Sequence, residues 1–406
     1  MRGSNAASAD AELALLLAGT GRRRQHARAR IAELAAAAHP RRLVAYLDER
    51  RLLALLGSRL LDVLPEPPAT LRDAVAAAID RNRLEAMAID GATTRLARRL
   101  EDQGIAALPL KGPRLAQALY GDTGMRASAD VDILVPAESL ERAVTLARAE
   151  GYGAPTEDVG PGELPELHFE MPHPRLPTVE LHWRVHWYES GFSQAALRRS
   201  GPAEDGLRRA QPADELAMLL LFYARDGFHG LRHAADIAAW WDGRATPSGP
   251  TAGLLDEHAA RYTDMARALR AAAACAALHA GVPAAALLSG TRRLDRGERL
   301  AVALADWATE DDRDQLAANI ALVDGLLSPR GAALKFTRRQ LWPPAWDLLP
   351  RGEPAPHGPA LGLRASHAAK TLARFGLALR RIRGGQPWRP LPPAACDHEP
   401  APAPEV

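Results

Sequence analysis

Apolar positions in the first hundred residues follow a helical period. Leucines recur at intervals of three or four residues from position 13 and again from position 43, and prolines then interrupt the pattern at 65–68. The next segment, 70–100, keeps helical spacing throughout. This spacing predicts a long helix over 70–100, preceded by shorter ones. We therefore expect a helical N-terminal domain over residues 1–103.

The pattern changes after residue 104. Several short segments read in turn as strand or helix: strands at 105–110, 129–135 and 178–187, helices at 112–120 and 139–150. In the last of the strands, polar and apolar side chains alternate as they do on a half-exposed strand. Strands that alternate with helices predict a small α/β unit, which we place at 104–192.

Helical spacing returns beyond residue 193. The expected helices cover 212–225, 229–241, 254–280, 306–327, 335–341 and 365–382. They predict a helical C-terminal domain over 193–383. Proline and glycine dominate 384–406, which we expect to be a disordered tail. The predicted fold class is α+β: a small mixed-sheet core flanked by helical N- and C-terminal domains.

Composition narrows the classes of function. The chain has 406 residues and a formal net charge of +2, so it is not expected to bind nucleic acid through overall charge. Its first residues lack the apolar segment of a signal peptide, and no long, strongly apolar run is present. We expect a cytoplasmic protein without membrane association.

The first candidate for chemistry is a pair of aspartates on the middle predicted strand. Asp130 and Asp132 are two residues apart, so both side chains leave the same face, roughly 7 Å apart at the backbone. Carboxylates so placed can hold Mg²⁺ together with substrate phosphates. Without a cation they would repel, and the sequence shows no obvious cationic partner. So short a motif also fits a solvated strand end that carries two acids.

A second candidate precedes this strand. Lys111 and Gly112 stand between a predicted strand and a predicted helix, with Pro113 in its first turn. The N–H groups of a helix N-terminus favour phosphate, and a lysine adds positive charge. Lys111 is also one of only three lysines in an arginine-rich chain. Arg126 can contact a phosphate or one of the aspartates, or serve only in an ion pair that holds the loop.

Glu180 is the expected third acid, on the polar face of the strand at 178–187. His182 lies beside it on that face and is a candidate for substrate contact. The histidines at 168, 173, 182 and 186 also suggest zinc. On one strand His182 and His186 would be roughly 13 Å apart, too far to share an ion, so we favour polar sheet-face residues over a zinc site.

The segment from Leu110 to Tyr152 resembles the uncharacterised bacterial nucleotidyltransferases, which belong to the DNA polymerase β-like superfamily. The residues that carry this resemblance are Leu110, Lys111, Gly112, Leu119 to Asp122, Arg126, Asp130 to Val135, and Glu150 to Tyr152. Val179 to Trp183 looks like the family's next strand, and Arg232 to Asp236 like a later helical element. The pair Gly112-Pro113 departs from the superfamily's usual Gly-Ser or Gly-Gly.

The resemblance implies a nucleotidyltransferase core that uses Mg²⁺ or Mn²⁺ and an NTP. Asp130, Asp132 and Glu180 are then the catalytic and metal-binding residues, and Lys111, Gly112, Arg126 and His182 contact the nucleotide. The acceptor is a hydroxyl or phosphate of a small molecule, peptide or protein. Two alternatives stay open: a degenerate core kept as a binding or scaffold module, and modification of a polynucleotide, which the near-neutral charge disfavours.

Overall fold

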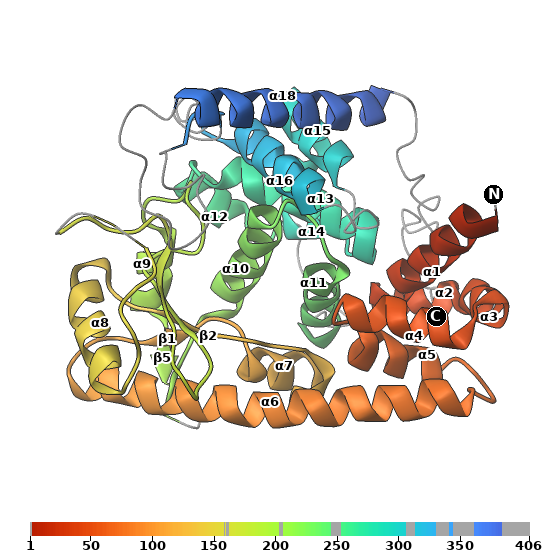
Figure 1. Ribbon diagram of the computed structural model, residues 1–406, viewed down its shortest axis with the longest axis horizontal. Coiled ribbons are helices and arrows are strands. Elements are labelled where there is room, and N and C mark those ends of the chain that lie inside the picture. The colour runs from red at the N-terminus through yellow and green to blue at the C-terminus, as the bar shows by residue number, and fades with distance from the viewer. Residues whose placement is uncertain are drawn as a thin grey trace, which may run out of the picture.

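The computed structural model of the chain describes residues 2–157, 159, 162–202, 206–244, 253–305, 313–329, 341–343 and 361–383. Within these residues the protein is mainly helical, with a four-stranded sheet and a second sheet of two short strands. The four-stranded sheet lies at one end of the long helix α6 and the N-terminal helices lie at its other end (Figure 1).

The N-terminal helices pack around a leucine-rich core. They are α1 (Arg2–Ala18), α2 (Gly21–His26), α3 (Arg28–Ala37), α4 (Pro40–Glu49), the π-helical turn η1 (Leu53–Gly57) and α5 (Ser58–Leu61). Helix α6 follows as one uninterrupted helix of 34 residues, Ala69–Asp102, as its periodicity predicts. Leu231 and Ala235 of a much later helix complete this core, so segments far apart in sequence share it.

The main sheet is mixed, as expected for an α+β fold. Its strands are β1 (Leu108–Pro109), β2 (Val131–Leu134), β3 (His168–Met171) and β4 (Val179–His182). Their order is β1-β2-β4-β3, with β2 parallel to β4 and the other pairs antiparallel. This order sets the acidic strand β2 directly beside β4.

Each face of the sheet has a different character. Val131 and Ile133 are buried against α6 and against α8 (Leu140–Ala149). Asp132, between them in sequence, points to the opposite face. Helix α10 (Pro212–Arg225) lies towards that face, and Leu134 belongs to the same hydrophobic cluster as the buried residues of α10. Apolar burial on one side therefore fixes which side chains are available for chemistry on the other.

The remaining elements connect the sheet to the later helices. Between strands lie α7 (Pro113–Tyr120) and the 3-10 turns η2 (Thr123–Met125) and η3 (Ala137–Ser139). After the sheet come α9 (Phe192–Arg199), β5 (Gly201–Pro202), β6 (Arg208–Arg209), α10, α11 (Leu231–Arg244), α12 (Asp256–Arg261), α13 (Ala266–Ala280), α14 (Ala284–Leu287), η4 (Ser289–Arg293), α15 (Arg296–Leu304), α16 (Arg313–Leu327) and α18 (Leu361–Arg383). Helix α18 lies across α15 and α16 (Figure 1).

Several predicted elements differ in extent. The strand expected at 178–187 ends at His182, and β3 was not predicted. The helix expected at 254–280 is broken into α12 and α13, because the backbone leaves the helical conformation at Tyr262. Of the expected helix at 306–327, the part from Arg313 is helical. Residues 306–312, 335–340 and 384–406, for which helix or disorder was expected, lie outside the described residues.

Helix length and composition also bear on membrane association. Among the helices that the structure describes, none is both long enough and apolar enough to cross a bilayer.

Candidate active site

Three carboxylates meet on the polar face of the sheet. Asp130 immediately precedes β2, Asp132 lies within it, and Glu180 lies in the adjacent strand β4. The parallel register pairs Asp132 directly with Glu180. One oxygen from each of the three carboxylates lies within 4.8 Å of the others. The three acids named from the sequence therefore converge on a single point.

Asp132 is the most enclosed of the three acids. Its side chain is 2% exposed and lies 3.0 Å from the Lys111 ammonium and 3.0 Å from Nε2 of His182. Burial raises the pKa of Asp132, but Lys111 and His182 outweigh it and hold the pKa well below its usual value. The expectation of two aspartates without a cationic partner is therefore wrong for Asp132. Its partners come from the turn after β1 and from strand β4, which only folding brings near.

Asp130 has a different environment. Within the described part of the chain it makes no ion pair or hydrogen bond through its side chain. Burial and the neighbouring charge of Asp132 raise its pKa, and the more distant Lys111 only partly offsets them. The repulsion expected from the sequence is thus present. It helps to raise the pKa of Asp130, whereas Lys111 and His182 lower the pKa of Asp132. A carboxylate in this state gains from any cation placed beside it.

Lys111 and Gly112 form the turn that leads from β1 into α7. Gly112 has a φ of +79°, a conformation that side chains rarely adopt, and Pro113 opens the helix as predicted. The backbone N–H of Leu110 donates to the carbonyl of Asp132, which holds this turn against β2. The Lys111 ammonium also lies 4.4 Å from the centre of the Phe222 ring. The lysine is thereby fixed between the acids and α10.

His182 and Glu180 extend the polar network. Nε2 of His182 lies 3.0 Å from both Asp132 Oδ1 and Glu180 Oε2. Burial would lower the pKa of His182, but the hydrogen bonds to the two carboxylates outweigh it and raise the pKa. Burial would likewise raise the pKa of Glu180, but the bond from His182 lowers it overall. Glu180 therefore stays ionised at neutral pH, available to a cation or a proton.

Arg126 does not bond to any of the three acids. Its Nε donates to Asp236 on α11 at 2.9 Å, and its side chain is 4% exposed. The Tyr120 hydroxyl donates to the other oxygen of Asp236 at 2.7 Å. Of the roles considered for Arg126, this geometry supports the structural ion pair. The partner, however, lies 110 residues away and not in the adjacent loop.

Three further histidines, His173, His186 and His233, fall outside the acidic site. His186 lies beyond the end of β4, not on the strand as expected, and burial lowers its pKa to about 3. His173 accepts backbone N–H groups at Nδ1 and so stabilises a turn. His233 of α11 forms a hydrogen bond with Asp226 at 2.8 Å.

One cation near the acids was not identified from the sequence as a site residue. Arg232, in the first turn of α11, interacts electrostatically with Asp130 and lowers its pKa. Burial lowers the pKa of Arg232 itself. Among the described residues, Arg232 makes no ion pair. The only sequence signal was the resemblance of the stretch from Arg232 to Asp236 to a family element, which gave no role.

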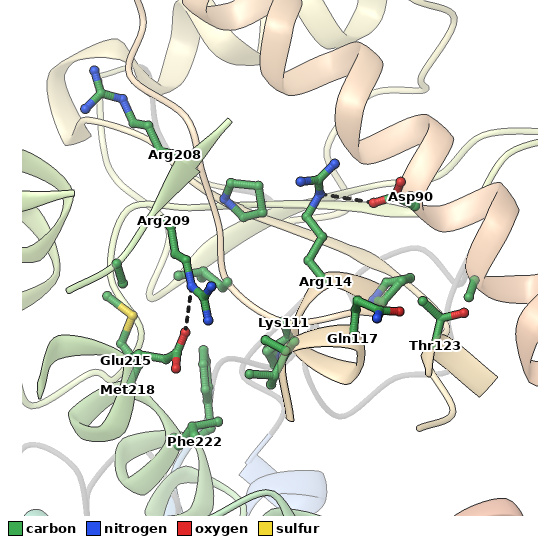
Figure 2. Close-up of a pocket in the computed structure, with 18 of the residues that line it drawn as sticks. Asp90, Lys111, Arg114, Gln117, Thr123, Arg208, Arg209, Glu215, Met218 and Phe222 are labelled. Atoms are coloured by element: carbon green, nitrogen blue, oxygen red, sulfur yellow. Dashed lines mark ion pairs between the residues drawn. The ribbon is translucent and has the colours of Figure 1, made fainter. Parts of the chain in front are cut away.

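A cavity of about 920 Å³ adjoins the site on the far side of Lys111. Figure 2 shows Arg114 and Arg209 on its walls, paired with Asp90 and Glu215 respectively. The floor is apolar and includes Met218 and Phe222 of α10. Lys111 belongs both to this cavity and to the acidic cluster, so the two are contiguous. The hairpin β5–β6 that closes one wall was not predicted.

Comparison with known proteins identifies a family. No curated protein matches the chain. The model of the uncharacterised nucleotidyltransferase family matches residues 36–281, more than half of the 406 residues, and its range includes the acids, Lys111 and α11. The chain therefore belongs to the uncharacterised nucleotidyltransferase family.

Proposed function

We propose that this protein is a metal-dependent nucleotidyltransferase, which moves a nucleoside monophosphate from an NTP to a hydroxyl or phosphate of an acceptor. The observation that carries the proposal is the convergence of Asp130, Asp132 and Glu180 within 4.8 Å. Membership of the family supports it at the level of reaction class. The acceptor would be a small molecule, peptide or protein.

The residues present fit a hard divalent cation. Carboxylate oxygens are the ligands that Mg²⁺ and Mn²⁺ prefer, and Asp130, Asp132 and Glu180 would hold the ion. Burial and the charge of Asp132 raise the pKa of Asp130, and Lys111 and Arg232 offset this only in part, so a cation beside Asp130 would stabilise its ionised form. When bound, such an ion neutralises the triphosphate and stabilises charge in the transition state.

The chain's own groups would bind and orient the substrates. Lys111 lies at the start of α7, where first-turn N–H groups have no acceptor within the helix, so the two can receive phosphate oxygens together. Arg232 would add a second positive charge beside Asp130. Glu180 completes the metal site or accepts the proton of the attacking hydroxyl. Its lowered pKa favours the first role, because it keeps the carboxylate ionised for a cation but makes it a weaker proton acceptor.

A second candidate is a nucleotide-binding module without transfer activity. Pro113 favours it, because proline at the first position of α7 removes one backbone donor from the phosphate seat. The intact triad of acids favours the enzyme.

The test has two stages. Calorimetry with each NTP, in Mg²⁺ and then in EDTA, measures whether binding needs the metal. Intact-mass analysis of candidate acceptors after incubation with the bound NTP then detects the added nucleotide. We expect metal-dependent binding and a mass increase of one NMP, both lost in Asp130→Asn. Equal NTP affinity with and without metal refutes the proposed site. Metal-dependent binding without transfer to any acceptor supports the binding module.

A further inference from the structure

Next to the acidic triad lies a second group of ligands with a different chemistry. His168 of β3 and His182 of β4 are directly paired across the antiparallel register, and Glu180 lies two residues from His182 on the same face. One ligand atom from each of the three lies within 4.8 Å of the others. Two imidazole nitrogens and a carboxylate oxygen therefore meet where two neighbouring strands lie side by side.

The distances suit one small ion. Glu180 Oε2 lies 3.0 Å from Nε2 of His182 and 3.8 Å from Nε2 of His168. Two ligands on a tetrahedral ion with metal–nitrogen bonds of ~2.0–2.1 Å are about 3.3 Å apart, between these two values. A ligand atom of His168 and one of His182 lie within 4.8 Å of each other, so small side-chain rotations would bring all three ligands to bonding distance.

His168 has no evident structural task. Its side chain is 22% exposed, and among the described residues neither of its ring nitrogens makes a hydrogen bond. Nδ1 is buried, whereas Nε2 faces Glu180. Within the described ranges no hydrogen bond commits Nε2 to another partner, so this nitrogen is available to a ligand on the side that faces Glu180.

We propose that His168, Glu180 and His182 form a second metal site, which takes a transition-metal dication such as Zn²⁺, Co²⁺ or Mn²⁺ in preference to Mg²⁺. Imidazole nitrogen suits these ions, whereas Mg²⁺ prefers oxygen. The ion replaces the proton on Nε2 of His182, which faces both Asp132 and Glu180, and that proton is released to solvent. Solvent or substrate would fill the remaining coordination position.

The second site shares Glu180 with the proposed transfer site and to that extent rests on it. Glu180 would then belong to both sites. The site on the β2 side would offer carboxylate oxygens, and the site on the β3 side would offer imidazole nitrogens as well. The zinc hypothesis set aside from the sequence considered His182 and His186 along one strand. The pairing across strands with His168 became visible only with β3 in place.

The test uses the full-length chain without a tag, stripped of metal, and titrates Co²⁺ in a large excess of Mg²⁺. The d–d absorption of Co²⁺ and calorimetry report binding directly, without any nucleotide. We expect one Co²⁺ to bind and to persist in excess Mg²⁺. His168→Ala should weaken Co²⁺ binding at least tenfold. His39→Ala is the matched control, because His39 is exposed and its side chain does not cap α4.

His168→Phe guards against a folding defect, since it keeps an aromatic ring against His182, whose ring centroid is 4.6 Å away, and removes both nitrogens. If a folded His168→Phe protein binds Co²⁺ with unchanged affinity, the second site is overturned. Displacement of Co²⁺ by Mg²⁺ at a comparable concentration also overturns it. In His168→Phe, Mg²⁺-dependent NTP binding should persist, so this result separates the two proposals. If the wild-type protein binds Co²⁺ but does not bind NTP, the proposed transfer site is rejected and the second metal site stands.

Discussion

Asparagine in place of each aspartate, one at a time, should change stability in opposite directions. The two substitutions are chemically identical and lie two residues apart on one face of β2. Asp132→Asn removes the charge that Lys111 and His182 neutralise at 3.0 Å each. Asp130→Asn removes a charge that burial and Asp132 already disfavour. The first should therefore destabilise the protein, and the second should leave stability unchanged or slightly higher.

The expected size follows from the burial of the ion pair. Breaking a buried pair costs about 3–5 kcal/mol, and asparagine keeps some hydrogen bonding, so we expect about 2–3 kcal/mol for Asp132→Asn. For 406 residues the entropy of unfolding is roughly 0.8 kcal/mol/K. Dividing the expected loss in free energy of unfolding by this entropy gives a decrease in Tm of about 3 °C. The gain for Asp130→Asn should be under about 1 °C.

The measurement is a thermal melt of the wild type and both variants at pH 7 in EDTA, so that no metal contributes. Because the pKa of Asp132 is lowered in the folded state, its contribution is complete above the unfolded value near 4 and is lost as pH falls. The gap between wild type and Asp132→Asn should therefore narrow below about pH 4. Equal shifts for the two variants at pH 7 would refute this electrostatic account.

Other predictions test separate parts of the structure. Lys111→Met should raise the Kd for NTP about tenfold in calorimetry, and unchanged affinity would remove Lys111 from the phosphate site. A double-mutant cycle of Arg126→Gln and Asp236→Asn, followed by urea unfolding, should give a coupling energy of about 3 kcal/mol; a value near zero contradicts the buried pair. His279 is buried with its pKa lowered to about 3, so acid protonates the unfolded state first and stability falls as pH drops below 6.5. At pH 5 the part of the loss that comes from His279 should be about 2 kcal/mol, so His279→Asn should lose about that much less stability than the wild type; an identical pH profile for the variant would contradict this.

The sequence predicted the acids better than their partners. Asp130 and Asp132 were found because a period of two along a strand fixes which side chains share a face. Glu180 followed from the same rule on the next strand. Burial of Val131 and Ile133 then confirms which face is apolar. The sequence pattern was sufficient where the geometry depended only on neighbouring residues of one strand.

The missing parts depend on contacts distant in sequence. The partner of Arg126 lies 110 residues away, and no periodicity relates the two. Strand β3 has four residues, as β2 and β4 do, but Pro165 and Pro172 interrupt the pattern on either side of it, so the sequence there reads as a loop. Without it, the cross-strand pairing of His168 with His182 could not be inferred. The contacts of Asp132 with Lys111 and His182 could not be inferred for the same reason, since these residues lie in other parts of the sequence.

The buried contact of Asp236 with Arg126 and Tyr120 has a consequence for how substrates enter and products leave. It fastens α11 to the segments on either side of η2, so the later helices cannot swing away as a hinged lid unless this pair breaks. At about 3 kcal/mol, such an open form would be populated below about 1%. Turnover should therefore proceed with the helical wall in place, and exchange should follow the movement of side chains around Lys111 instead of a rotation of whole domains.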